Sequence, residues 1–179
     1  MSAYPSAPWR LAGPVAIVAG PRKGSVLLLG LYGEGSTLRY GEIAGLTGPV
    51  VRYMYVDDAR SLAGGREIWA VPKERMTLRW RSAKRTEVEA RTADGRLLLR
   101  AGWARPSVRL PLPCLAPFVG TLDSKLRLAS VAGLLWAGPV MVELEVPRGS
   151  PLSALRLAGQ RIGLAGRLNA IATRPRDIR

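Results

Sequence analysis

The sequence predicts a mainly β protein, a barrel or sandwich built from many short strands. Apolar and charged residues alternate with a period of two in Thr77–Arg81 and in Glu87–Arg91, which is typical of half-buried strands. The chain contains 20 glycines and 14 prolines, many of which separate short apolar runs. With 179 residues, 47% of them hydrophobic, it can build a real core. We therefore expect one domain over residues 1–179.

The first half of the chain contains short apolar runs bounded by turn-forming residues. The turn region Gly45–Pro49 separates two of the expected strands, and Arg60–Gly65 reads as a further turn. The strands expected in this half are Val15–Ala19, Ser25–Leu31, Thr37–Ile43, Val50–Val56 and Glu67–Val71.

The second half contains a clear hairpin signal at Asp94-Gly95. Thr86–Arg91 and Arg96–Trp103 should therefore pair as antiparallel neighbours. Prolines 111, 113 and 117 remove backbone donors, so Leu110–Gly120 is expected to be a loop or crossover. A short helix is expected at Ser153–Ala158. The remaining expected strands are Leu126–Val131, Val140–Val146 and Gly163–Ile171.

The residue inventory excludes several kinds of catalytic site. The chain has no histidine, which excludes a Ser-His-Asp triad, a Cys-His pair, histidine-ligated zinc and any imidazole acid or base. Its one cysteine, Cys114, excludes an internal disulfide and a multi-cysteine metal site. We expect no metal and no cofactor. Enzyme chemistry would have to use carboxylates, lysine, arginine, hydroxyls and backbone.

The net charge of +14 raises the possibility of nucleic-acid binding. Most of the 27 basic residues are arginines spread along the chain, and the densest stretch, Arg75 to Arg91, also carries glutamates. This distribution favours solvated strand faces. Single-stranded nucleic-acid binding through Trp80 and Trp103 is the weakest alternative, and no nucleic-acid partner is expected.

No membrane association is expected from the sequence. The start of the chain lacks the pattern of a secretory signal. The longest uncharged stretch, Leu128–Val142, is short for a membrane span and is interrupted by glycine and proline. A cytoplasmic protein is the expectation.

One segment points to a family. Gly65-Arg66-Glu67-Ile68-Trp69-Ala70-Val71-Pro72-Lys73 follows the string Tyr53-Met54-Tyr55-Val56-Asp57-Asp58, and this arrangement resembles the acetoacetate decarboxylase superfamily. The resemblance implies an antiparallel β-barrel with few short helices and a lyase acting on a small β-keto acid. It also implies a homo-oligomer.

The resemblance assigns roles to particular residues. It implies that Lys73 forms the Schiff base and that the carboxylate of Glu42, in Tyr40-Gly41-Glu42, faces this lysine and transfers the proton. Supporting or pocket roles are expected for Arg66, Glu67, Trp69 and Glu74.

The chemistry sets a condition on the lysine. A lysine that attacks a carbonyl must first lose its proton, through burial or a nearby positive charge. The apolar residues that precede Lys73, which are Ile68, Trp69, Val71 and Pro72, could supply that burial.

Departures from the family pattern keep other functions open. The decarboxylases carry a second lysine directly after the reactive one, where this chain has Glu74. On a continuous strand the two side chains would face opposite sides, whereas a strand ending at Pro72 would let Glu74 pair with Lys73 and raise its pKa. The decarboxylases also use an arginine in an early strand, where this chain has Gly13-Pro14, and an acidic residue in the next strand, where Val26–Leu31 has none. Aldol, dehydration or cyclisation chemistry on keto acids, or a non-catalytic keto-acid-binding barrel, are therefore the alternatives.

Overall fold

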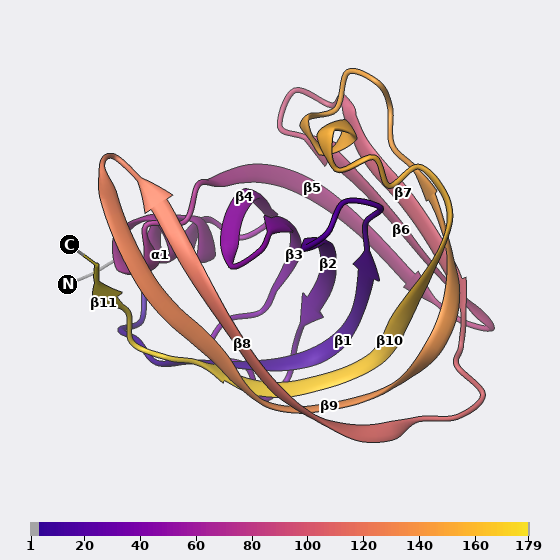
Figure 1. The fold of residues 1–179 in the computed structure, drawn as a ribbon, viewed down its shortest axis with the longest axis horizontal. Coiled ribbons are helices and arrows are strands. Elements are labelled where there is room, and N and C mark those ends of the chain that lie inside the picture. Colours follow the sequence, from indigo (N-terminus) through magenta and orange to yellow (C-terminus); the bar gives the residue numbers. More distant parts are fainter. Residues whose placement is uncertain (1–3, 179) are drawn as a thin grey trace.

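The computed structural model describes residues 4–178, and strands of one curved sheet make up most of them (Figure 1). The prediction of a mainly β protein is confirmed. The first seven strands are β1 (Trp9–Ala19), β2 (Ser25–Tyr32), β3 (Tyr40–Thr47), β4 (Val50–Val56), β5 (Lys73–Ser82), β6 (Arg85–Thr92) and β7 (Leu97–Ala104). The last four are β8 (Leu110–Leu122), β9 (Lys125–Glu145), β10 (Gly159–Ala172) and β11 (Arg176–Asp177).

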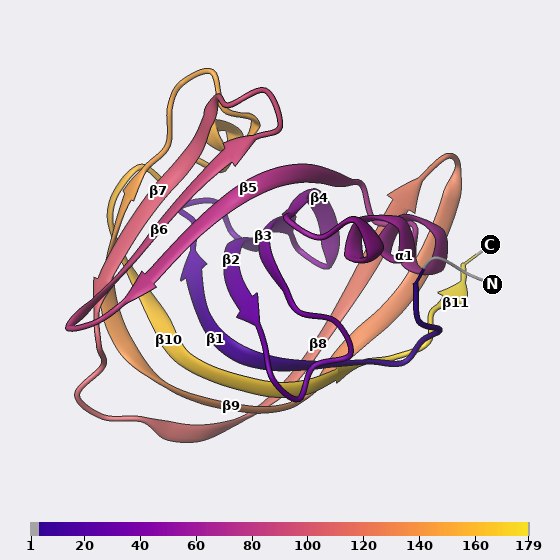
Figure 2. The ribbon, with the colours of Figure 1, turned by 180° about the vertical axis from the view of Figure 1, so that it is seen from behind.

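The sheet curls into a ring. Its strands follow the order β10-β1-β2-β3-β4-β5-β6-β7-β9, and β9 also pairs with β10 to complete the circuit. The pairing is antiparallel except where β4 meets β5 and, at one residue pair, β8. Seen from both sides, the ring is crossed at one end by the β8–β9 hairpin, close to both chain ends (Figures 1 and 2).

The parallel pairing of β4 with β5 explains the one α-helix in the described residues. Parallel neighbours need a crossover connection, and α1 (Ala59–Trp69) provides it. The side chain of Asp58 caps its N-terminus by accepting from the Ser61 N–H at 2.8 Å, and Ala70 ends it in the left-handed conformation. The predicted strand Glu67–Val71 and the predicted turn Arg60–Gly65 are therefore wrong.

The region predicted as a proline-rich loop, Leu110–Gly120, is also wrong, because it forms most of strand β8. β8 pairs along its whole length with β9, while its other edge meets β4 at Val119 only. An edge strand tolerates proline because one side of its backbone needs no partner. The prolines thus mark an edge strand.

Other elements differ in extent from the prediction, and one hairpin agrees with it. β3 continues to Thr47, through part of the turn expected at Gly45–Pro49. Leu126–Val131 and Val140–Val146 belong to one long strand, β9. The expected helix at Ser153–Ala158 is a 3-10 helix over Pro151–Leu155. The β6–β7 hairpin is antiparallel as predicted, and Gly95 adopts the positive φ of 86° that its turn requires.

The first three strands are buried on both faces. Alternate residues of β2 and β3, such as Leu27, Leu29 and Ile43, join a core packed against β5–β7, β9 and β10. The opposite faces of the same strands join a second apolar cluster that includes Trp9, Tyr32 and Trp69. This second cluster surrounds the cavity described below. No helix among residues 4–178 has the length and apolar character needed to cross a membrane.

Candidate active site

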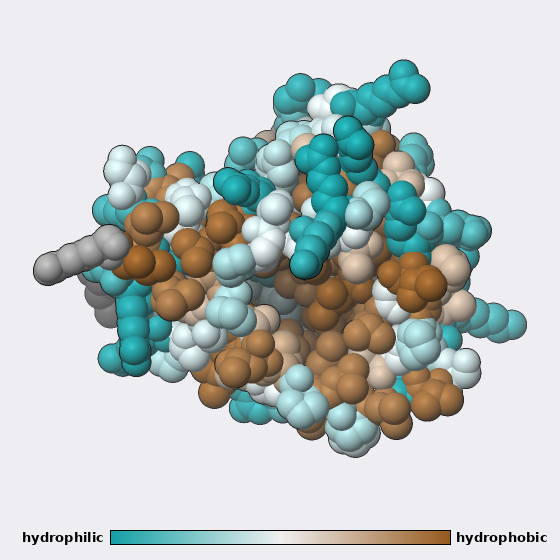
Figure 3. All heavy atoms as spheres, in the orientation of Figure 1, coloured by the Kyte–Doolittle hydropathy of each residue, from teal (hydrophilic) through white to brown (hydrophobic). Residues whose placement is uncertain are grey.

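A cavity of about 570 Å³ lies inside the ring, lined by β1–β5, α1 and the β8–β10 strands. Figure 3 shows hydrophobic side chains around a hollow on this face of the molecule. Of the described residues that line the cavity, the charged ones are Lys73 and Glu42. The site is therefore an apolar chamber with one amine and one carboxyl group.

Lys73 is the first residue of β5 and follows the crossover helix directly. Its backbone lies beside Met54 of β4, and its side chain is only 5% exposed. The Nζ atom donates a hydrogen bond to Ser61 Oγ of α1 at 3.0 Å. It also lies 5.2 Å from the centre of the Tyr40 ring and 5.7 Å from that of Trp9. The amine is thus enclosed between the helix and aromatic rings.

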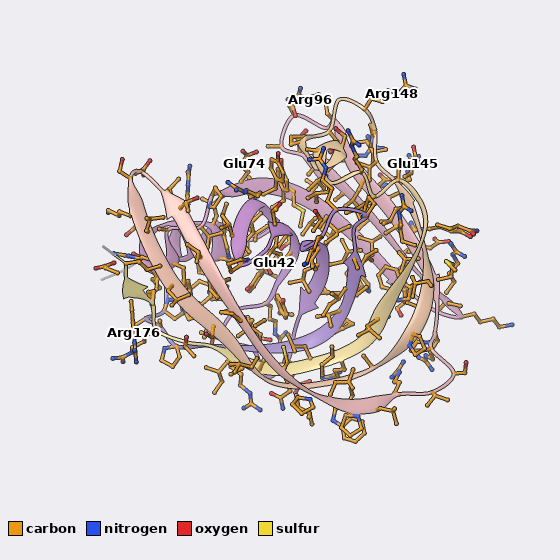
Figure 4. The ribbon with its side chains drawn as sticks, in the orientation of Figure 1. Glu42, Glu74, Arg96, Glu145, Arg148 and Arg176 are labelled. Atoms are coloured by element: carbon orange, nitrogen blue, oxygen red, sulfur yellow. The ribbon has the colours of Figure 1, made fainter. Side chains whose placement is uncertain are left out.

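Glu42 approaches the amine from β3 and is 5% exposed. Its Oε2 atom lies 3.8 Å from Lys73 Nζ. Hydrogen bonds from Tyr40 and Tyr32 also hold this carboxylate. Figure 4 shows Glu42 inside the ring. A carboxyl group that two phenols hold in position therefore faces the Lys73 amine.

Burial shifts the pKa of both groups toward their neutral forms. Desolvation lowers the pKa of Lys73, and the negative charges of Glu42 and Asp58 partly oppose this. Desolvation also raises the pKa of Glu42, against the opposing effects of Lys73 and the two phenols. Removing a charged group from water disfavours its charged form, so an amine and a carboxylic acid move in opposite directions. Compared with water, the cavity therefore weakens the charged form of both the amine and the acid.

The helix comes close to the lysine because α1 has glycine where it faces β5. A Cβ atom added to Gly65 would lie 2.4 Å from Cδ and Cε of Lys73. A Cβ added to the neighbouring Gly64 would lie 2.5 Å from the Trp9 ring. The glycine pair thus makes room for the lysine and for one aromatic wall of its chamber.

The six residues named from the sequence occupy different places. The structure brings Lys73, Glu42 and Trp69 to the cavity, where Trp69 packs edge to face on Trp9 with ring centres 4.7 Å apart. Glu74 is exposed on the other face of β5 and points away from the chamber (Figure 4). The two residues Arg66 and Glu67 are exposed on α1 and do not line the cavity.

The exposed end of α1 makes contacts of its own. Tyr4 donates a hydrogen bond to the Glu67 side chain. Arg127 donates to the carbonyl oxygens of Glu67 and Ile68, with the second bond at 2.6 Å. These contacts attach the helix to the N-terminal segment and to β9, outside the cavity.

Sequence reasoning missed Ser61 and Tyr32 as site residues. Ser61 is fully buried and accepts the hydrogen bond of the lysine, and Tyr32 supports Glu42. Asp58 is a residue type that often begins helices, and this signal would have located the serine on the first turn. The nucleic-acid alternative loses its stacking surface, because Trp103 is 4% exposed and packs edge to face against Trp80.

Comparison with known proteins finds likeness in solved structures. The sequence matches no protein-family model and no curated protein. Acetoacetate decarboxylase from Legionella pneumophila subsp. pneumophila str. Philadelphia 1 aligns with 100% of this chain and 90% of its own, at 15% identity and a TM-score of 0.69. The enduracididine biosynthesis enzyme MppR, in complex with pyruvate, aligns with 98% and 92% at 16% identity and a TM-score of 0.62.

A further structure agrees with these. An acetoacetate decarboxylase-like enzyme from Sphingomonas wittichii RW1 aligns with 96% of this chain and 92% of its own, at 11% identity and a TM-score of 0.59. All three alignments span nearly the whole chain, so the similarity covers the ring, the crossover helix and the β8–β9 hairpin together. This chain therefore has the acetoacetate decarboxylase-like fold.

Proposed function

We propose that this protein is a lyase that forms a Schiff base between Lys73 and a small β-keto acid and releases carbon dioxide. The single observation that supports this most is the buried amine of Lys73, 3.8 Å from a buried Glu42 in an apolar cavity. Burial lowers the pKa of the amine, which increases the fraction that can attack a carbonyl. A non-catalytic binder would have no need of an amine with a lowered pKa at this place.

The reaction would begin with addition of Lys73 Nζ to the keto carbon. The keto oxygen leaves as water, taking one proton from the amine and one from the neutral acid of Glu42, and a cationic iminium remains. The bond between the α-carbon and the carboxylate then breaks. Its electron pair moves toward the iminium nitrogen, which gives carbon dioxide and a neutral enamine. Glu42, reprotonated by water, returns a proton to carbon. Water then hydrolyses the new iminium to ketone and amine, and the proton released in this step returns to the Glu42 carboxylate.

Covalent trapping with borohydride tests this proposal. Incubation with acetoacetate and borohydride should give a reduced adduct that peptide mass spectrometry locates on Lys73. Lys73→Ala should lose both the adduct and turnover. A matched control is Lys84→Ala, which removes an exposed lysine from the β5–β6 turn and should leave both unchanged. Absence of an adduct on Lys73 in the unmodified protein would refute the proposal.

A second candidate is aldol or dehydration chemistry through the same iminium. It is favoured by the lining of the cavity, which includes no arginine among the described residues to hold a carboxylate during its departure. MppR, which shares the fold, is described in complex with pyruvate. Product analysis distinguishes the candidates, because only the decarboxylase releases carbon dioxide from the trapped substrate.

The proposal includes assembly into a homo-oligomer. Large apolar side chains stand exposed on the outer face of β9 and β10, among them Trp136, Met141 and Ile162, of which Ile162 is 73% exposed. Ile162 and Met141 are direct neighbours across the two strands. Exposed apolar patches of this kind mark association surfaces. Sedimentation velocity would give a monomer mass if this is wrong.

A further inference from the structure

The cavity is much larger than a small keto acid requires. Acetoacetate has about seven non-hydrogen atoms, whereas a cavity of about 570 Å³ has room for roughly 19 at about 30 Å³ each. Beyond Lys73, Glu42 and the two phenols, most of its lining is aliphatic or aromatic. Apolar space that a small keto acid would leave unfilled indicates that the ligand carries an apolar part.

The cavity runs from a closed end to an open mouth, as the residues of strand β3 show. Its alternate residues Glu42, Ala44 and Leu46 all face the cavity: the first two are buried, and Leu46 is half-buried. The exposed turn at Gly48 and Pro49 follows and also borders the cavity. The mouth is therefore at the β3–β4 turn, and the carboxyl group of Glu42 is at the closed end.

Residues of the neighbouring strands indicate the same closed end and the same mouth. On β2, Tyr32 is buried at the closed end, whereas Leu28 and Val26 are half-buried toward the mouth. Phe118 of β8 is half-buried on the opposite wall. From Glu42 to Leu46 the strand rises about 13 Å, at about 3.3 Å per residue. An apolar passage of this length leads from the reactive amine to solvent.

We infer that the substrate is a keto acid bearing a medium-length apolar chain of roughly eight to twelve carbons, as the length and volume of the passage indicate. The keto group lies at Lys73 and the chain runs along β2 and β3 toward the mouth. This inference rests on the proposed Schiff-base function and specifies its substrate class. Transfer of the chain out of water would supply binding energy that the few polar groups of the cavity cannot.

A homologous series of 3-oxo acids with about four to sixteen carbons tests the inference. The measurement is the second-order rate constant for borohydride-trapped adduct formation on Lys73. It should rise roughly threefold to fourfold per added methylene, which amounts to on the order of 1000-fold between four and ten carbons, and level off once the apolar chain exceeds roughly eight to twelve carbons.

Two variants test where the chain lies. Ala44→Phe fills the middle of the passage, and Leu46→Gln makes its half-buried end polar without adding bulk. Either should lower the ratio of the ten-carbon to the four-carbon rate constant by at least about tenfold. Ala104→Phe, at an exposed position on β7, is the matched control and should leave this ratio unchanged.

The outcomes separate the two proposals. Adducts that form on Lys73 with no dependence on chain length would overturn the substrate class and leave the Schiff-base function standing. A length dependence that neither Ala44→Phe nor Leu46→Gln reduces would overturn the placement of the chain. If no 3-oxo acid forms an adduct, the Schiff-base function fails, and the substrate class fails with it.

Discussion

Replacing Gly65 with alanine should disable Lys73 while the chain remains folded. The new Cβ would lie 2.4 Å from Cδ and Cε of Lys73 and 2.9 Å from Nζ. Carbon atoms in contact normally lie about 3.5–4.0 Å apart, so the lysine side chain must retreat by more than about 1 Å. A misplacement of about 1 Å in a reacting group costs on the order of 100-fold in rate. We expect a loss of that size in both adduct formation and turnover.

The same substitution should change stability little. Alanine in place of glycine within a helix gains about 0.5–1 kcal/mol, and crowding against a flexible side chain offsets part of this. The free energy of unfolding in urea should thus stay within about 1 kcal/mol of the parent value. Gly33→Ala is the control, because a Cβ there has no atom within 4 Å. Parent-like trapping kinetics in Gly65→Ala would refute the reasoning, as would activity lost only through unfolding.

Three further predictions concern charge. Glu42→Gln should lower turnover by about 10²–10⁴-fold, and it should move the midpoint of the pH profile for adduct formation to lower pH, because Glu42 raises the pKa of Lys73. Burial lowers the pKa of Lys73 in the folded protein. Between that lowered pKa and about 10.4, the lysine binds a proton in the unfolded chain but not in the folded one, so its contribution to stability rises with pH. The difference in unfolding free energy between the parent and Lys73→Met, measured in urea across pH, should show that rise. Glu74→Ala should leave trapping kinetics unchanged, because Glu74 is exposed on the opposite face of β5, and a changed midpoint would contradict this.

Much of the sheet could be predicted from the sequence because burial alternates along its strands. The β6–β7 hairpin follows from Asp94-Gly95 and the period-two pattern on both sides. The pairing of Lys73 with Glu42 followed from the family resemblance, and the structure brings the two side chains to 3.8 Å. Whether Glu74 pairs with Lys73 depended on whether both residues lie on one strand. β5 begins at Lys73, so the two side chains face opposite sides of it.

The helix and strand β8 could not be predicted because local signals there are overridden by topology. Residues 59–69 contain adjacent glycines, which disfavour a helix interior. The parallel pairing of β4 with β5 nevertheless requires a crossover, and close packing of Gly64 and Gly65 on the aromatic and lysine side chains compensates. The prolines of β8 argue against a strand only if both of its edges are paired, and sequence alone does not reveal which strand lies at an edge.

One physical effect, removal of water, shifts the pKa of both candidate reacting groups of this site. Lys73 and Glu42 carry opposite charges in solution, and desolvation is the largest cause of the pKa shift in each. If their mutual attraction dominated, both would stay charged, and a protonated amine cannot attack a ketone. The attraction across 3.8 Å and the hydrogen bonds that Tyr32 and Tyr40 donate to Glu42 favour the charged forms, but burial has the larger effect on each pKa. The apolar chamber therefore shifts both groups toward the neutral forms that iminium formation would consume in the proposed mechanism.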